Sequence, residues 1–335
     1  MTLEEDVSGL AMALMEVDST SGNEHAVIDR ADDLLSRRGW SIHRIPVNGE
    51  RECLFASTNG DPDVTLSTHL DTVPPFIAPS LEGDELRGRG ACDAKGIAAA
   101  MILAAERLRQ KGRDVGLLFV VGEETCHDGA HAANQWALAN LAPRPRLLIN
   151  GEPTGSTLAV GTKGAQRVTL RLTGKAAHSA YPHMGKSATH DLVRLLAELD
   201  GMAWPEDALL GQTTVNIGKL EGGVADNVIA PWAEARLMFR LVTPASEIQQ
   251  RVEAWVAGRA SLEWGVMVPP VRLGKRDGFP TSVAAFATDI PELGAWGTPC
   301  LFGPGSVHVA HTAHEHVSVR ELAAAVESYE RLALT

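Results

Sequence analysis

The sequence contains little cysteine, no long apolar run and no excess of basic residues, and each absence excludes a class of protein. The four cysteines among 335 residues are scattered, with no CxxC pair, which favours the reduced thiols of a cytoplasmic protein over a disulfide framework. No apolar run reaches the roughly 18 residues that a membrane-spanning helix needs. The N-terminal residues show no basic stretch followed by an apolar one, so no signal peptide is expected.

Positive charge is also scarce. The chain has 30 Lys and Arg against 42 Asp and Glu, a formal net charge of −12. A nucleic-acid or anionic-membrane partner would require a basic face, so we expect neither. Hydrophobic residues make up 44% of the chain and charged ones 21%, an ordinary globular balance that excludes wholesale disorder. The length exceeds that at which a single core usually stops growing, so two domains are expected.

The first half of the chain alternates helical and strand-like patterns. Short apolar runs suited to buried strands alternate with amphipathic or alanine-rich segments, which predicts an α/β sheet with helices on its faces. The predicted helices cover 3–16, 23–38 and 96–110, and the predicted strands cover 64–67, 115–121 and 146–150. The same pattern returns near the C-terminus, with a strand at 299–302 and a terminal helix at 317–333.

The middle of the chain has a different pattern. Residues 166–173 alternate like a strand with one wet face, and they begin the order strand-helix-strand-strand-helix-strand of a ferredoxin-like α+β unit. The later elements are expected at 188–199, 213–220, 233–242, 246–259 and 266–273. Ser246 and Gln249 fit a capping box at the start of the second helix. We therefore predict one α/β domain, residues 1–162 and 272–335, interrupted by an inserted lid domain, residues 163–271.

Imidazoles and carboxylates follow the predicted central strands at the points where these strands end. His69 and Asp71 follow the strand 64–67. Glu123 and Glu124 follow the strand 115–121, and Glu152 follows the strand 146–150. Because ligands of an open α/β sheet bind beyond the carboxyl ends of its strands, we expect these side chains to meet at one edge. Short segments rich in such donors are typical of sites for one or two divalent ions.

Two further donors come from loops. Asp93 lies in a Gly-rich loop just before a predicted helix, and His311 follows the strand 299–302. Any one of these acids and histidines could be a helix cap or a structural side chain. The adjacent pair of Glu123 and Glu124 is harder to explain in that way. Two carboxylates directly after a buried strand repel one another unless a cation lies between them.

The motifs that contain these residues resemble the M20 family of metallopeptidases and amidohydrolases. In the family's order, they are Ser67-Thr-His69-Leu-Asp71, Gly88-Arg-Gly-Ala-Cys-Asp93-Ala-Lys-Gly96, Gly122-Glu-Glu-Thr125, Gly151-Glu152-Pro-Thr154 and His311-Thr-Ala-His314-Glu315. The resemblance extends into the lid through Gly174-Lys-Ala-Ala-His178, Thr214-Val-Asn216-Ile-Gly218 and Asn227-Val-Ile229. It implies a phosphorylase/hydrolase-like α/β catalytic domain that carries a ferredoxin-like lid for dimerisation.

The resemblance also implies a role for each donor. Two divalent ions, Zn²⁺ or alternatively Co²⁺ or Mn²⁺, would activate a bridging hydroxide for attack on an amide carbonyl. Asp71 would hydrogen-bond the His69 imidazole, and Glu123 would be the general base and acid. The implied metal ligands are His69, Asp93, Glu124, Glu152 and His311, with Asp93 between the two ions.

Three lid residues are implied to contact the substrate. His178 would stabilise the oxyanion, often from the partner subunit of a dimer, and Asn227 and Arg240 would hold the substrate carboxylate. An ordinary loop position for His178 and a solvated strand position for Arg240 are the alternatives.

The sequence departs from the family pattern at several positions. Thr68 and Cys126 replace glycines that are usual in the family. Because His308, His311 and His314 recur at spacings of three, the choice of ligand among them is open, and His311 is favoured by its place relative to Glu315. The other histidines, His127 and His131 among them, are expected at solvated loop or helix positions.

The expected activity is removal of an N-acyl group, most simply N-acetyl, from an amino acid such as N-acetylornithine in amino-acid biosynthesis. A succinyl-diaminopimelate desuccinylase and a dipeptidase or carboxypeptidase are alternatives within the same chemistry, and a non-catalytic small-molecule-binding relative is an alternative outside it. The partner is then a small N-acyl amino acid or short peptide. A homodimer is also expected, and an exposed edge strand of the lid offers a physical route to it.

Overall fold

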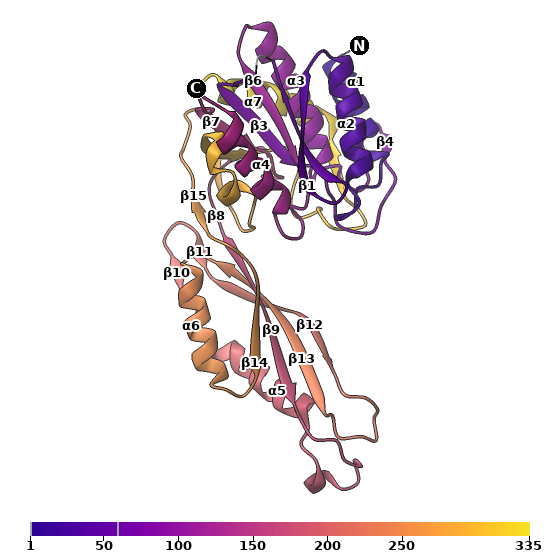
Figure 1. The fold of residues 1–335 in the computed structure, drawn as a ribbon, viewed down its shortest axis with the longest axis vertical. Coiled ribbons are helices and arrows are strands. Elements are labelled where there is room, and N and C mark those ends of the chain that lie inside the picture. Colours follow the sequence, from indigo (N-terminus) through magenta and orange to yellow (C-terminus); the bar gives the residue numbers. More distant parts are fainter. Residues whose placement is uncertain (1, 59) are drawn as a thin grey trace. The chain divides into compact units, whose positions relative to one another are not determined.

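Two compact units make up the chain, which the computed structural model describes over residues 2–58 and 60–335 (Figure 1). The first unit comprises Met1–Val160, Leu273–Ser282 and Thr288–Thr335. The second comprises Gly161–Arg272 and Val283–Ala287. Among the described residues, no helix is both long and apolar enough to cross a membrane.

A mixed sheet forms the centre of the first unit (Figure 1). Its strands follow the order β1 (Ser41–Asn48), β2 (Arg51–Ser57), β6 (Val115–Val120), β3 (Val64–His69), β7 (Leu147–Asn150), β17 (Thr298–Phe302) and β8 (Leu158–Thr162). Strand β3 runs parallel to both β6 and β7, and β7 runs parallel to β17. Every residue of β3, β6 and β7 is buried, as expected for parallel strands that are covered on both faces.

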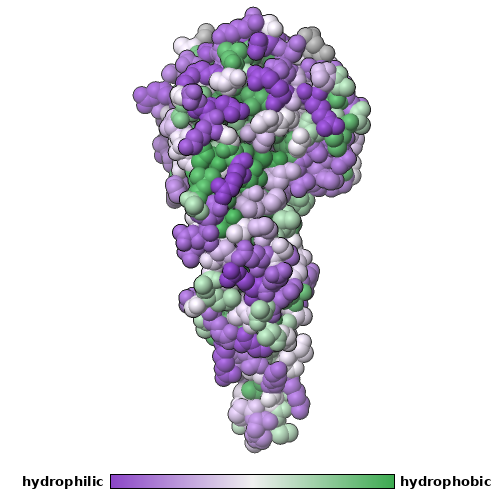
Figure 2. All heavy atoms as spheres, turned by 90° about the vertical axis from the view of Figure 1, so that its left-hand side faces the viewer, coloured by the Kyte–Doolittle hydropathy of each residue, from purple (hydrophilic) through white to green (hydrophobic). Residues whose placement is uncertain are grey.

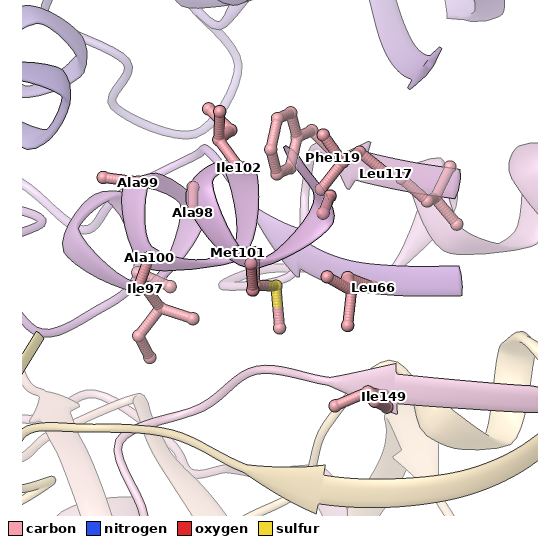
Figure 3. Packing of buried hydrophobic residues seen from close by; sticks show 14 of the residues in the cluster. Leu66, Ile97, Ala98, Ala99, Ala100, Met101, Ile102, Leu117, Phe119 and Ile149 are labelled. Atoms are coloured by element: carbon pink, nitrogen blue, oxygen red, sulfur yellow. The ribbon is translucent and has the colours of Figure 1, made fainter. Parts of the chain in front are cut away.

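Helices pack against this sheet from both sides. The helices α1 (Leu3–Met15), α3 (Lys95–Gln110) and α7 (Val319–Ala333) pack against one another, and α2 (His25–Arg37) contacts α1, β1 and β2. Figure 3 shows Ile97 and Met101 of α3 beside the buried strand residues Leu66 and Ile149. The helix α3 packs against β3 and β6, and the loop with Asp93 directly precedes its first residue, Lys95.

The opposite face of the sheet is covered by α4 (Asp128–Asn140) and the 3-10 turn η4 (Gly294–Trp296). Phe55 of β2 pairs in register with Leu118 of β6. The residues before and after Leu118, which are Leu117 and Phe119, are labelled beside α3 in Figure 3. Because side chains alternate along a strand, Phe55 and Leu118 point away from α3. There the Phe55 ring packs against Trp136 of α4 and Trp296 of η4, with ring centroids 5.3 and 5.0 Å apart.

The second unit is a four-stranded antiparallel sheet with two helices (Figure 1). The strand order is β12 (Thr214–Gly222), β13 (Trp232–Leu241), β9 (Gly164–Thr173) and β14 (Ser261–Val268), and the helices are α5 (Ala188–Ala197) and α6 (Ala245–Val256). Burial alternates along β13, so one face of the sheet packs against both helices in a core that includes Phe239. The edge strand β12 is largely exposed.

Short elements complete both units. Three short strands form a separate sheet in the order β18 (His316–Ser318), β5 (Glu85–Arg87) and β4 (Ser80–Glu82). Strands β15 (Val271–Arg272) and β16 (Thr281–Ala284) pair with β8, and β10 (Glu206–Asp207) pairs with β11 (Gly211–Gln212). The 3-10 turns are η1 (Pro182–Met184), η2 (Glu198–Gly201) and η3 (Ile290–Glu292). Hydrophilic side chains cover much of the surface that Figure 2 shows.

The predicted fold class is confirmed, and the predicted central helices and strands agree with the structure to within a few residues. Two local predictions are wrong. The last strand of the lid begins at Ser261, not at residue 266. The helix α6 has no capping box, because Pro244 with ψ 139° starts the helix and places Ser246 inside its first turn. A capping box is present instead at α1, between Thr2 and Glu5.

Candidate metal centre

Three neighbouring strands of the central sheet end at the candidate site. His69 is the last residue of β3, Glu123 and Glu124 follow β6 after Gly122, and Glu152 follows β7 after Gly151. Because β3 is parallel to both β6 and β7, their carboxyl ends lie at one edge of the sheet.

The Asp93 carboxylate lies between two imidazoles. One of its oxygens is 3.1 Å from His69 Nε2, and the other is 3.2 Å from His311 Nε2. Asp93 belongs to the loop that precedes α3, whereas His311 belongs to the loop between β17 and β18. Two segments more than 200 residues apart in sequence thus meet at one carboxylate.

A second carboxylate lies beside each imidazole. His311 Nε2 is 2.9 Å from Glu124 Oε1, and His69 Nε2 is 4.0 Å from Glu152 Oε1. The nearest ligating atoms of His69, Asp93 and Glu124 all lie within 4.8 Å of one another. The five predicted ligands therefore form two imidazole–carboxylate pairs that share Asp93.

His311 is the member of the C-terminal histidine series that reaches this group. Its backbone has φ 63°, a left-handed conformation that costs free energy for a residue other than glycine and that functional sites often retain. His308 and His314 are exposed loop residues on either side of it.

The contacts between Asp93 and the two imidazoles shift the pKa values of all three groups. Hydrogen bonds to Asp93 and then to Glu124 raise the pKa of His311 to about 10. Burial lowers the pKa of His69, but Asp71 and Asp93 outweigh it and raise that pKa well above its usual value. Burial raises the pKa of Asp93, but His311 and His69 outweigh it, so this pKa lies below its usual value.

For Glu123 and Glu152 the effect of burial on the pKa is not outweighed. Burial raises the pKa of Glu123 well above its usual value, and the charge of Glu152 adds to the shift. Burial also raises the pKa of Glu152, where His69 opposes the shift and Asp93 adds to it. Carboxylates this close to one another ionise together when a cation lies among them. Two imidazole nitrogens and three carboxylates are donors that Zn²⁺ accepts, so the residues present fit a divalent metal.

Asp71 is tied to the loop of the two glutamates rather than chiefly to His69. His69 Nδ1 lies 2.9 Å from the backbone carbonyl oxygen of Asp71 and 3.5 Å from its carboxylate. The carboxylate accepts hydrogen bonds from the backbone N–H groups of Glu123 and Glu124, at 3.1 and 3.2 Å, and from the Ser21 hydroxyl at 2.8 Å. Asp71 therefore orients the imidazole through its carbonyl and the glutamate loop through its side chain.

The three lid residues belong to the second unit. His178 and Asn227 lie on adjoining segments, because the Ser179 N–H donates to the Asn227 carbonyl and His178 forms an isolated bridge with Val228. Both residues are exposed. Arg240 lies on β13, where it pairs in register with Thr214 of β12.

One interaction near the site was not predicted. His127 is half-buried rather than solvated, and its Nδ1 lies 2.7 Å from the carboxylate of Asp289, which is buried. The charge of Asp289 contributes to the raised pKa of Glu123. Asp289 follows no predicted strand and belongs to no motif that the sequence revealed, so no sequence signal marked it. His131 is exposed, as expected.

Comparisons with known proteins identify the family of this chain. The family model "Peptidase family M20/M25/M40" matches residues 65–335. A probable carboxypeptidase of Aspergillus terreus is 36% identical over 95% of this chain and 84% of its own length. A peptidase M20 domain-containing protein of Schizosaccharomyces pombe is 35% identical over 98% of this chain and 84% of its own length.

Solved structures show the same fold at lower identity. A tripeptidase from Staphylococcus aureus has a TM-score of 0.79 and 19% identity, with 99% of each chain covered. An M20 family metallo-carboxypeptidase from Sulfolobus solfataricus has a TM-score of 0.77 and 18% identity, with 98% of each chain covered. The fold, the family model and the relatives agree, and they show that this chain is a hydrolase that belongs to peptidase family M20/M25/M40.

Proposed function

We propose that the protein is a metal-dependent amide hydrolase that releases an amino acid with a free carboxylate from a short peptide or an N-acyl amino acid. The observation that carries this proposal is the position of Asp93, whose two carboxylate oxygens each face an imidazole. His69 with Glu152 would hold one divalent ion, and His311 with Glu124 a second. The bound ions, Zn²⁺ or alternatively Co²⁺ or Mn²⁺, would supply Lewis-acid activation of water and of the amide carbonyl.

Glu123 is proposed as the general base and acid. It lies in the loop after β6, next to Glu124, so the same loop would supply a ligand and a proton acceptor. Its carboxylate takes a proton from the attacking water, the oxygen of that water bonds to the amide carbon, and the C–N bond then breaks. Glu123 passes the proton to the leaving amine nitrogen. The hydrogen bonds from its loop to Asp71 fix its backbone relative to His69.

His178 is proposed to stabilise the oxyanion. Its Nδ1 accepts a hydrogen bond from the Ala180 N–H at 3.1 Å, so the other ring nitrogen, Nε2, carries the proton in the neutral imidazole. Nε2–H is then the donor available to a developing negative charge on the carbonyl oxygen. The Tyr181 ring packs edge-on against His178, with ring centroids 6.1 Å apart, and restricts its orientation.

The lid geometry supports a homodimer. Asn227 lies in the loop that joins β12 to β13, and Arg240 lies at the far end of β13. Arg240 lies seven residue steps along β13 from Ala233 at the loop end of the paired strands, which at ~3.3 Å per step is roughly 23 Å. One small substrate can contact both side chains if they come from different copies of the chain. The exposed edge strand β12, with Ile217 and Leu220, would join the two copies.

The names of the curated relatives favour a C-terminal peptide bond over the N-acetyl group of N-acetylornithine. Chemically these substrates are alike, because each presents a secondary amide on the nitrogen of an amino acid with a free α-carboxylate. N-succinyl-diaminopimelate shares that feature. We therefore propose recognition of the free carboxylate as the common requirement, with Asn227 and Arg240 as its contacts.

Isosteric glutamine substitutions at two adjacent glutamates distinguish the role of the proposed base from that of the proposed ligand. Glu123→Gln removes the proton acceptor and leaves the ligand set intact, so we expect retained metal and a kcat lowered by about 10²–10⁴. Glu124→Gln removes the negative charge of a proposed ligand and replaces one of its two oxygens with an NH2 group, so we expect loss of one of the two ions. Elemental analysis of dialysed protein and amide-hydrolysis kinetics measure the two effects. Retained turnover in Glu123→Gln, or full metal content in Glu124→Gln, contradicts the assignment.

A panel of paired substrates tests the proposed specificity. Dipeptides with a free C-terminal carboxylate should be hydrolysed, and the same dipeptides with a C-terminal amide should react about 10–100-fold more slowly, because a charge-assisted hydrogen bond is lost. N-acetylornithine and N-succinyl-diaminopimelate belong in the same panel and are compared by kcat/KM. Equal rates for the free and amidated peptides would contradict carboxylate recognition. Turnover of N-acetylornithine alone would restore the deacetylase assignment.

The proposed dimer is tested by placing a charge on the exposed lid edge. Leu220→Glu introduces a carboxylate where two β12 strands would meet, so we expect a monomer in light scattering and a fall in kcat. Leu138→Glu is the matched control, because Leu138 is similarly exposed on α4 of the first unit, at 44% against 53% for Leu220. A wild-type protein that is monomeric and fully active would rule out the dimer proposal.

A further inference from the structure

A buried ion pair lies next to the candidate metal centre and has no role in the proposed chemistry. Arg89 Nη1 donates to Glu315 Oε2 at 2.6 Å, and both residues are 2% exposed. Arg89 belongs to the loop before α3, and Glu315 directly precedes β18. Buried charges of opposite sign are costly unless their geometry and hydrogen bonding are nearly complete, so the remaining contacts of this pair decide what it does.

The second oxygen of Glu315 holds the backbone of the Asp93 loop. Glu315 Oε1 accepts hydrogen bonds from the N–H groups of Gly90, Cys92 and Asp93, at 2.9, 3.3 and 3.2 Å. Gly90 has φ 88°, a conformation that favours glycine and that turns its N–H toward the carboxylate. Glu315 therefore fixes the main chain on which the Asp93 side chain is mounted.

Arg89 connects this loop to the two segments that carry the histidines. Its Nε donates to the carbonyl of Pro75, four residues after Asp71, and its Nη1 also donates to the carbonyl of Thr312, which follows His311. Both distances are 3.3 Å. A planar guanidinium with several fixed donors can make such divergent contacts, and a lysine ammonium cannot reproduce them.

We propose that Arg89 and Glu315 are positioning residues that set the two Asp93 oxygens between His69 and His311. This inference rests on the proposed metal site. It adds to that site a pair of side chains that links the three segments that carry its ligands. The opposite charges of the pair largely cancel, so the pair acts on the ligands through geometry rather than through a net charge. Partners that orient metal ligands typically change metal affinity or activity by about 10–100-fold when they are altered.

The test compares three variants with the wild-type protein, using Zn²⁺ as the probe. Glu315→Gln keeps the size of the side chain and leaves Arg89 without its counter-charge. Arg89→Lys keeps a positive charge beside Glu315 and removes the fork that reaches Pro75 and Thr312, so it tests the same positioning in a charge-balanced core. Glu106→Gln is the matched control. It breaks a partly buried pair with Arg38 toward the other end of α3.

Zinc affinity is measured by competition with a chromogenic chelator. The constants kcat and KM are measured at zinc saturation, and Tm is measured by calorimetry on the full chain. We expect Glu315→Gln and Arg89→Lys to weaken zinc binding by about 10–100-fold and to lower kcat more than they change KM. Glu106→Gln should lower Tm and leave zinc affinity unchanged.

The outcomes separate this inference from the proposed function. If the Arg89 and Glu315 variants lower Tm but bind zinc and turn over as the wild-type protein does, the pair stabilises the fold and does not position ligands. If the wild-type protein itself binds no zinc, cobalt or manganese, the proposed metal site fails, and this inference fails with it.

Discussion

The crowding of carboxylates at one edge of the central sheet is the constraint on which the rest of the structure depends. Asp93, Glu123, Glu124 and Glu152 converge there, and two imidazoles compensate a part of their charge. Burial makes this crowding more costly, because a buried carboxylate without a cation favours its neutral form. A divalent cation removes the conflict, and the donor set is one that such a cation accepts.

The architecture follows from the need to bring these donors together from distant parts of the chain. The parallel strands β3, β6 and β7 supply His69, the glutamate loop and Glu152 from the first half of the chain. The second pair requires His311, and β17 returns beside β7 after the lid segment to deliver it. The Arg89–Glu315 pair is hydrogen-bonded to the backbone of the Asp93 loop, of Pro75 and of Thr312. The strand order of the central sheet therefore also determines where the donors of the candidate site meet.

Much of the site could be predicted because its residues follow strands that the sequence marks clearly. Apolar runs end at His69, Glu123 and Glu152, and the parallel sheet then brings their ends together. Asp289 could not be predicted, because it follows a turn that no periodic pattern marks. The contacts of Asp71 could not be predicted in detail either. Its spacing from His69 suits a carboxylate contact, but the nearer acceptor is its carbonyl.

Long-range partners are the part that local sequence patterns do not contain. Arg89 and Glu315 are 226 residues apart, and neither position shows by itself that its charge is buried. The prediction of a capping box at α6 is wrong for a related reason. The motif Ser246–Gln249 is present, but the helix begins earlier, with Pro244 as its N-cap. The first three lid strands were predicted because burial on one face imposes the alternation that β13 shows.

The most direct measurement of the central claim is a crystal structure of the zinc-loaded protein with anomalous diffraction collected on both sides of the zinc edge. The account predicts two zinc peaks about 3.5–4 Å apart, with one Asp93 oxygen on each ion. His69 and Glu152 should complete one coordination sphere, and His311 and Glu124 the other. A single peak, or two peaks that Asp93 does not bridge, would contradict the account.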